Sequence, residues 1–140
     1  MKDRVFLDSN ILLYFFDKLD VRKQKTAEAL VSSLVKSKKG QISTQTLQEY
    51  FNVVTKKLKC DKLKAKDAVE YYATAFPLHI NTVKDILAAI TISIKNQLSF
   101  YDSLIIAAAK AEGCGTVYSE DLNDGQEVDG VKIVNPFRQE

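Results

Sequence analysis

The sequence is poor in histidine and cysteine, with one histidine and two cysteines among 140 residues. Cys60 and Cys114 lie far apart and have no partner histidines, so neither a disulfide framework nor a zinc-binding pattern is expected. A single histidine excludes phosphodiester cleavage by a pair of histidines. That residue, His79, follows Pro77 among apolar residues, which favours a structural role over a catalytic one.

Long apolar runs and nucleotide-binding loops are also missing. No stretch reaches the roughly 18 apolar residues that a membrane span needs. Met1–Val5 runs directly into strand-like sequence, so we expect no signal peptide and a cytoplasmic protein without membrane contact. The chain has neither Gly-x-x-x-x-Gly-Lys-Ser/Thr nor Gly-x-Gly-x-x-Gly, which excludes the usual phosphate-cradling loops. With 46% hydrophobic and 27% charged residues, the composition is that of a globular domain.

Apolar runs typical of buried strands alternate with helical periodicity along the chain. Strands are expected at 5–7, 41–43, 78–80 and 115–118, and helices at 11–16, 22–38, from 44 onward, and at 64–76, 82–97 and 101–112. A break at Asp17–Asp20 separates the first two helices, and Asp129-Gly130 between two valines is a hairpin signal. The alternation predicts a single α/β domain over 1–140, with three α/β/α layers and a central parallel sheet of four or five strands.

Four acidic residues from distant parts of the chain can meet at one edge of this sheet. Asp8 and Asp121 each come directly after a predicted strand. Glu49 lies in the first turns of the helix that follows the second strand. Asp102 opens the helix that precedes the strand ending at Asp121. Ligands bind beyond the carboxyl ends of strands in open parallel sheets. Clustered carboxylates repel one another unless cations neutralise them, and hard oxygen ligands suit Mg²⁺ or Mn²⁺. The pattern indicates a metal centre that activates water for phosphoryl displacement.

Each acid also has a purely structural interpretation. Asp8 can cap the helix that follows it, and Glu49 fits a capping box with Thr46. Asp102 has a similar capping spacing, and turn chemistry accounts for the acids at 120–125. The metal centre therefore rests on the joint placement of the four residues.

Positive charge gathers in the first half of the chain, where 15 Lys and Arg face nine acidic residues, against five and nine in the second half. Six lysines crowd into one stretch with a single acid among them: Lys56, Lys57, Lys59, Lys62, Lys64 and Lys66. Such a run is usually a solvated helix face. The alternative is a surface that follows a phosphate backbone, and composition leaves both open. A second basic group lies earlier, at Arg22, Lys23 and Lys25.

Three segments resemble motifs of the PIN-domain family, which includes the toxin nucleases called VapC. Asp8–Leu12 (Asp-Ser-Asn-Ile-Leu) looks like the family's opening motif, and Tyr101–Ala109 is similar to its helix motif. Ser119–Gln126, followed by Gly130–Phe137, closely resembles the ending of a bacterial subgroup. Glu49 matches the family's isolated mid-chain acid. The resemblance spans essentially the whole chain, and the order and spacing of the motifs make it specific.

The resemblance implies an endoribonuclease that depends on Mg²⁺ or Mn²⁺. Its implied metal-binding and catalytic acids are Asp8, Glu49, Asp102 and Asp121. The family's last motif is variable, so Glu120 and Asp124 compete with Asp121 for the fourth place, and Asp124 is the stronger competitor. Asn10 would order the site through hydrogen bonds, and Ser119 fits the small hydroxyl residue that precedes the last acid.

The resemblance also implies partners. They are single-stranded or structured RNA, a small antitoxin protein that inserts into the acidic cleft, and a second copy in a homodimer. The charge pattern, and not the resemblance, suggests that the stretch from Lys56 to Lys66 helps to grip the RNA. Two alternatives stay open: a non-catalytic PIN-like module that binds RNA or protein, and a metal-dependent phosphatase. The full acidic set argues against the module. A phosphatase with an aspartyl nucleophile would need a second acid at position 10, where the chain has Asn10.

Overall fold

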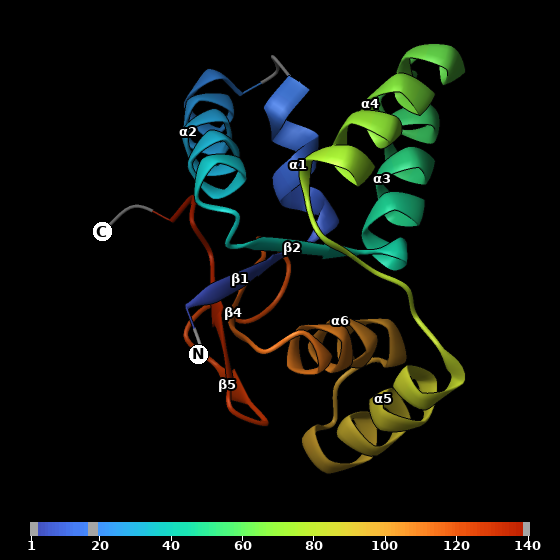
Figure 1. Ribbon diagram of the computed structural model, residues 1–140, viewed down its shortest axis with the longest axis vertical. Helices are drawn as coiled ribbons and strands as arrows, with labels where there is room; N and C mark the ends of the chain where they lie inside the picture. Colours follow the sequence, from blue (N-terminus) through green and yellow to red (C-terminus); the bar gives the residue numbers. More distant parts are fainter. Residues whose placement is uncertain (1–2, 17–19, 139–140) are drawn as a thin grey trace.

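The computed structural model describes residues 3–16 and 20–138 (Figure 1). Strands and helices alternate along them as β1 Arg4–Leu7, α1 Ser9–Phe16, α2 Val21–Ser37, β2 Gly40–Ser43, α3 Thr44–Lys56, α4 Lys62–Ala75, β3 Leu78–His79, α5 Val83–Asn96, α6 Phe100–Ala111, β4 Cys114–Tyr118, β5 Glu127–Val128 and β6 Val131–Val134. The strands form one sheet in the order β3-β2-β1-β4-β6-β5. None of the helices in the described ranges is both long and apolar enough to span a membrane.

Helices cover both faces of the sheet. In Figure 1, α1 to α4 lie above β1 and β2, and α5 and α6 lie below these two strands. The central strand β1 contributes side chains to the hydrophobic cores on both faces of the sheet, because successive strand residues point to opposite faces. Phe6 packs in the core with α5 and α6, and Leu7 packs in the core with α1 to α4. Both side chains are fully buried. The α/β class with three layers, expected from the sequence, is confirmed.

The sheet has six strands, where the sequence predicted four or five. Its neighbours pair in parallel except β5, which pairs antiparallel with β6. The two are joined at Asp129-Gly130, whose φ angles of 50° and 85° are those that a two-residue hairpin turn needs. Val128 pairs with Val131, as the hairpin signal predicted. The extra strand is thus the short edge of this hairpin.

Two helix starts are capped by aspartate side chains, Asp20 at α2 and Asp61 at α4. At α1, the backbone N–H of Ile11 already donates a bond of 3.1 Å to the carbonyl oxygen of Asp8, so this helix begins directly after β1 and not at Ile11. Asp20 caps α2 by accepting a bond of 3.0 Å from the N–H of Lys23. The rest of the predicted break before α2, residues 17–19, lies outside the described residues.

Gly40 lies where strand β2 passes the end of α4. A Cβ atom added there would lie 2.7 Å from Cε1 of the buried Phe76 ring and 3.2 Å from Cβ of Leu34. We expect Gly40→Ala to lower the free energy of unfolding by about 1–3 kcal/mol, because the packed ring must move. Urea denaturation measures the change, with Ser33→Ala on the exposed face of α2 as a control. An unchanged free energy of unfolding would mean that the Phe76 ring can move aside without loss of packing.

Candidate metal-binding active site

The four predicted acids come together at the carboxyl edge of the sheet. Asp8 follows β1, and Asp121 lies in the loop after the adjacent parallel strand β4. Glu49 is in the second turn of α3, and Asp102 is in the first turn of α6. One pocket of about 240 Å³ is lined by Asp8, Ser9, Glu49, Asn52, Val53, Asp102, Ile105 and Asp121. Four segments that are remote in sequence thus bring their carboxylates to one hollow.

Asp8 is the most enclosed of the four acids, with 6% of its surface exposed. Its Oδ2 atom accepts a hydrogen bond of 2.8 Å from the Ser119 hydroxyl. Burial raises the pKa of Asp8 to about 6, because the charged form loses its hydration. The Ser119 hydrogen bond opposes this rise, and the negative charges of Glu49 and Asp121 add to it. A positive charge placed in the pocket would therefore be strongly attracted to this carboxylate.

Asn10 links two of the acids. Its Nδ2 atom lies 3.2 Å from Oδ2 of Asp8 and 3.1 Å from Oδ2 of Asp121. Its Oδ1 atom accepts a bond of 3.0 Å from the N–H of Glu120, and the Ser119 hydroxyl accepts one of 3.2 Å from the N–H of Asp121. Asn10 and Ser119 thus both join Asp8 to the acidic loop through hydrogen bonds.

Gln45 holds Glu49 against the start of α6, and the sequence analysis missed it. Its Nε2 atom lies 3.1 Å from Oε2 of Glu49 and 3.1 Å from the carbonyl oxygen of Tyr101, the residue before Asp102. The Ser9 hydroxyl donates to the other Glu49 oxygen at 3.3 Å. Gln45 is 4% exposed. The available signal was its position one helical turn before Glu49, on the same face of α3.

The helix caps leave two of the acids free to face the pocket. The α3 capping box is formed by Ser43 and Thr46, so the interpretation of Glu49 as the partner of Thr46 is wrong. At α6, the Ser99 hydroxyl accepts a bond of 3.2 Å from the N–H of Asp102. Capping thus uses the backbone of Asp102, while its side chain lines the pocket.

The structure distinguishes among the three acids that were candidates for the fourth metal-binding residue. Asp124 forms an ion pair of 2.9 Å with Arg138, and Glu120 forms one with Lys23. Of the three, it is Asp121 that lines the pocket. The expectation of Asp124 as a metal ligand beside Asp8 is therefore not supported, because its carboxylate accepts hydrogen bonds from Arg138 and from the backbone N–H of Asn135 and does not line the pocket. The ion pair with Glu120 also neutralises Lys23, one of the three residues of the second basic group noted in the sequence.

The donor set fits a hard divalent cation. All four acids supply carboxylate oxygens, the ligands that Mg²⁺ and Mn²⁺ prefer. Within residues 3–16 and 20–138, no three Asp, Glu, His or Cys side chains lie close enough to enclose an ion. Glu49 is held toward Gln45, whereas Asn10 draws Asp8 and Asp121 together. The pair of Asp8 and Asp121, joined by Asn10, matches the one or two carboxylates through which Mg²⁺ commonly binds while it keeps several waters.

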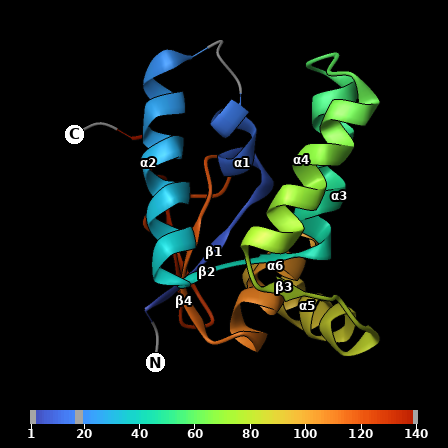
Figure 2. The ribbon, with the colours of Figure 1, turned by 45° about the horizontal axis from the view of Figure 1, so that its top comes forward.

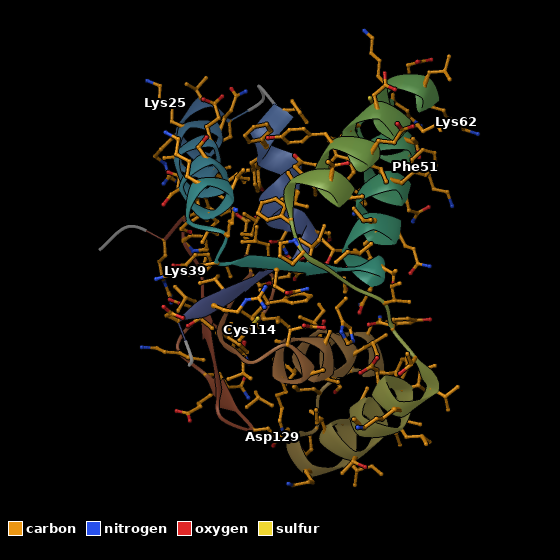
Figure 3. The ribbon with its side chains drawn as sticks, viewed as in Figure 1. Lys25, Lys39, Phe51, Lys62, Cys114 and Asp129 are labelled. Carbon is orange, nitrogen blue, oxygen red and sulfur yellow. The ribbon has the colours of Figure 1, made fainter. Side chains whose placement is uncertain are left out.

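The six lysines lie outside the pocket, toward the far end of the α3–α4 hairpin. Figure 2 shows the two helices side by side, and in Figure 3 Lys62 points outward from the end remote from the sheet. All six are exposed. Lys56 comes two turns after Glu49, about 10 Å along the helix axis. Glu49, Asn52 and Lys56 share one face of α3, so the stretch begins on the pocket side.

His79 lies in a separate cluster. Its Nδ1 atom is 2.6 Å from Oε2 of Glu112, and its Nε2 atom is 2.9 Å from Oδ2 of Asp85. The ring thus joins β3 to the start of α5 and the end of α6, as a structural histidine does. Burial lowers the pKa of His79, but the hydrogen bonds to Glu112 and Asp85 outweigh it, so the pKa rises above its ordinary value.

This cluster predicts a pH-dependent stability. Because its pKa is raised in the fold, protonated His79 stabilises the protein fully below about pH 6.5, and that contribution is lost as pH rises through the raised pKa. We expect His79→Gln to lower the free energy of unfolding by about 1–3 kcal/mol at pH 6, and by less at pH 9. Thermal unfolding at both pH values measures the difference. An equal loss of unfolding free energy at pH 6 and at pH 9 would contradict the pairing of protonated His79 with the two carboxylates.

Fold and site together define an α/β protein with a carboxylate pocket at the carboxyl edge of a parallel sheet. The family model described as the PIN domain matches residues 5–129. The chain therefore belongs to the PIN-domain family, whose members are typically nucleases that use divalent metal ions. No curated protein sequence matches the chain.

Several solved structures share this fold. The Mycobacterium tuberculosis toxin VapC20, described as cleaving the sarcin-ricin loop, aligns with a TM-score of 0.69 and 21% identity over 84% of this chain and 89% of its own. A toxin–antitoxin complex from Klebsiella pneumoniae aligns with 0.70 and 17% over 94% and 97%. VapBC2 from Rickettsia felis, bound to a promoter DNA fragment, aligns with 0.70 and 17% over 92% and 96%. At these identities the similarity establishes the fold.

Proposed function

We propose that the protein is an endoribonuclease that depends on Mg²⁺ or Mn²⁺ and cleaves RNA phosphodiester bonds at the acidic pocket. The observation that carries this proposal is the meeting of Asp8, Glu49, Asp102 and Asp121 around one pocket. A structural role alone does not require four carboxylates from four separate segments to face the same hollow, because their mutual repulsion costs stability. Family membership supports the same reaction class.

In this proposal, Asp8, Glu49, Asp102 and Asp121 hold the ion or ions. A bound ion would supply a water of lowered pKa, and positive charge for the attacking and leaving oxygens of the displacement. Asn10 keeps Asp8 and Asp121 together by donating to both carboxylates. Gln45 orients Glu49 by donating to Oε2. These amides fix the acids without adding charge, so the full negative charge stays available to the cation.

The protein also fits the toxin half of a toxin–antitoxin pair. Structures with the same fold were determined as toxin–antitoxin complexes from Klebsiella pneumoniae and Rickettsia felis. We propose a small antitoxin protein as the natural inhibitor, placing a basic side chain in the acidic pocket. An Arg guanidinium is the best candidate, because it pairs with carboxylates through two parallel hydrogen bonds.

A cleavage assay tests the enzymatic proposal. We expect labelled single-stranded RNA to be cut in Mg²⁺ or Mn²⁺, to stay intact in excess EDTA, and to be cut again when the metal is restored, because the carboxylates act only through the ion. Gel electrophoresis of the products measures this. Robust cleavage in EDTA would contradict the mechanism. Hydrolysis of a phosphate monoester in place of RNA would identify a phosphatase, and RNA binding without cleavage would identify a non-catalytic module.

A further inference from the structure

A second pocket, of about 510 Å³, is lined by residues of α1, α3 and α4 and by Cys60 between the last two helices. Three aromatic rings form part of its wall: Phe16 at the end of α1, Tyr50 on α3 and Tyr71 on α4. Tyr50 is buried, whereas Phe16 is 52% exposed and Tyr71 is 44% exposed. The volume lies in the range of ordinary ligand pockets. None of these residues lines the acidic pocket, so the two hollows are separate.

The two exposed rings are held in place by aromatic neighbours. The ring of the half-buried Phe15 lies 6.3 Å from that of Tyr71, with the two planes 15° apart, and 4.7 Å from that of Phe16. The fully buried Tyr72 lies 5.5 Å from Tyr71 and 6.1 Å from Phe16, measured between ring centroids. Rings fixed in this way lose little conformational freedom when a flat ligand packs against them.

The aromatic pocket lies beside the lysine-rich stretch. Lys64 lines the pocket, as does Cys60, whose neighbours along the chain include Lys59 and Lys62. Figure 2 shows α3 and α4 side by side, and in Figure 3 Lys62 points outward from their remote end. Exposed aromatic rings beside a positively charged surface are typical of proteins that bind single-stranded nucleic acid, because lysines follow the phosphates while bases stack on the rings.

We propose that this pocket binds one unpaired base of the RNA, while the neighbouring lysines bind its phosphates. This inference rests on the proposed function, because it takes RNA as the ligand. Stacking on Phe16 or Tyr71 suits any base, since every base has a flat face. The one acid of the pocket, Asp67, favours a base over a phosphate inside it. Its carboxylate can accept a hydrogen bond from the amino group of adenine, cytosine or guanine, but it repels an anion.

The distance between the two pockets fits a single RNA strand. Helix α1 joins them, because Ser9 at its start lines the acidic pocket and Phe16 at its end lines the aromatic one. These two residues are about 10 Å apart along the helix axis. On α3, the adjacent residues Glu49 and Tyr50 line the acidic and the aromatic pocket respectively. A strand with a phosphodiester bond at the acids can therefore place a base in the aromatic pocket a few nucleotides away.

RNA binding in EDTA tests the aromatic pocket without requiring cleavage. We expect Tyr71→Ala to weaken the binding of single-stranded oligoadenylate by about 10-fold, the size of effect typical of one lost stacked base. Tyr71→Phe keeps the ring and should bind as the wild type does. Inorganic polyphosphate carries the negative charge without bases, so its affinity should be equal for the wild type and Tyr71→Ala. Fluorescence of 2-aminopurine in the oligonucleotide reports stacking directly, and its quenching on binding should be weaker with Tyr71→Ala.

Two exposed leucines outside the pocket provide matched controls. Leu63 on α4 is 72% exposed. Leu87 is 60% exposed and belongs to the outer face of α5, an apolar face that the described residues leave uncovered. Leu63→Ala and Leu87→Ala should each keep the wild-type affinity for oligoadenylate. Circular dichroism checks that Tyr71→Ala stays folded, and Phe16→Ala provides a second variant of the same pocket.

The remaining outcomes overturn the proposal. Wild-type affinity for oligoadenylate in both Tyr71→Ala and Phe16→Ala would show that no base binds here, while metal-dependent cleavage by the wild type would leave the proposed function standing. Equal losses for oligoadenylate and polyphosphate would mean that the variant has lost phosphate contacts and not a stacked base. A wild-type protein that neither binds nor cuts RNA would refute both proposals. Lost binding of a co-expressed small protein, with RNA affinity unchanged, would assign the pocket to a protein partner.

Discussion

Asp8→Asn and Asp102→Asn should each reduce RNA cleavage at least about 1,000-fold. A metal ion contributes several kcal/mol to stabilising a phosphoryl-transfer transition state. An amide keeps an oxygen ligand but removes the charge that holds the ion. Initial rates of RNA cleavage in Mn²⁺ measure the loss, and calorimetric titration with Mn²⁺ measures ion binding separately.

The structure provides a matched control for this prediction. Asp124→Asn makes the same chemical change in the loop that carries Asp121, but Asp124 pairs with Arg138 and does not line the pocket. Its cleavage rate should stay close to that of the wild type. Wild-type rates in both Asp8→Asn and Asp102→Asn would refute the site assignment. A large loss in Asp124→Asn would mean that the fourth acid has been misassigned.

Asp8→Asn should not unfold the protein. In EDTA at neutral pH we expect it to raise the free energy of unfolding by about 1–3 kcal/mol. The reason is that the pKa of Asp8 is about 6 in the fold, against 3.8 for an ordinary aspartate. The folded wild type holds this proton more tightly, so it loses stability as pH rises from about 4 to about 6, whereas the amide of the variant has no proton to lose in this range. Urea denaturation at low and neutral pH separates this effect from lost activity.

Replacing Lys56, Lys57 and Lys59 with Gln should weaken RNA binding and flatten its salt dependence by about 0.7 log–log units for each lost phosphate contact. These lysines continue from the pocket face of α3 toward the hairpin end, so RNA that reaches the acids can extend along them. Turnover at saturating RNA should hardly change, because such contacts bind ground state and transition state alike. Fluorescence anisotropy with labelled RNA at several salt concentrations measures the slope.

A second triple variant controls for net charge. Lys36→Gln, Lys38→Gln and Lys39→Gln remove the same charge at the end of α2, just before β2 and so at the amino edge of the sheet. This variant should keep the wild-type salt slope. An unaltered slope in the Lys56 variant would support a merely solvated face, and would direct attention to Arg22 and Lys25. Equal losses in both variants would indicate a long-range effect of total charge.

Periodic features of the sequence predicted most of the fold. The helices repeat apolar residues every three to four positions, and Asp129-Gly130 favours the positive φ angles of a hairpin turn. Both signals are local, because backbone geometry and one buried face are enough to produce them. The number of strands was less predictable, since β3 and β5 contain only two residues each. Such short strands depend on neighbours in the sheet and leave little periodicity to recognise.

Contacts between remote segments decided what the sequence left open. Glu120, Asp121 and Asp124 share one loop, and turn chemistry accommodates all three equally. The choice between them came from long-range contacts: Asp121 lines the pocket and bonds to Asn10, 111 positions away, whereas Lys23 and Arg138 pair with Glu120 and Asp124. Gln45 shows the same limit, because its bond to the Tyr101 carbonyl joins two helices whose packing no local pattern encodes.

The sequence by itself determined the α/β class, the order of its elements and the four acids that can meet beyond the parallel strands, because each of these follows from local periodicity and from the direction of the chain. Only the tertiary structure decided which of the three acids in the last loop faces the pocket. It also showed that Lys23 forms an ion pair with Glu120, and which apolar face of α5 stays uncovered among the described residues. These outcomes depend on which surfaces pack together. Packing depends on the surfaces of two contacting segments, so the local sequence of one segment does not determine it.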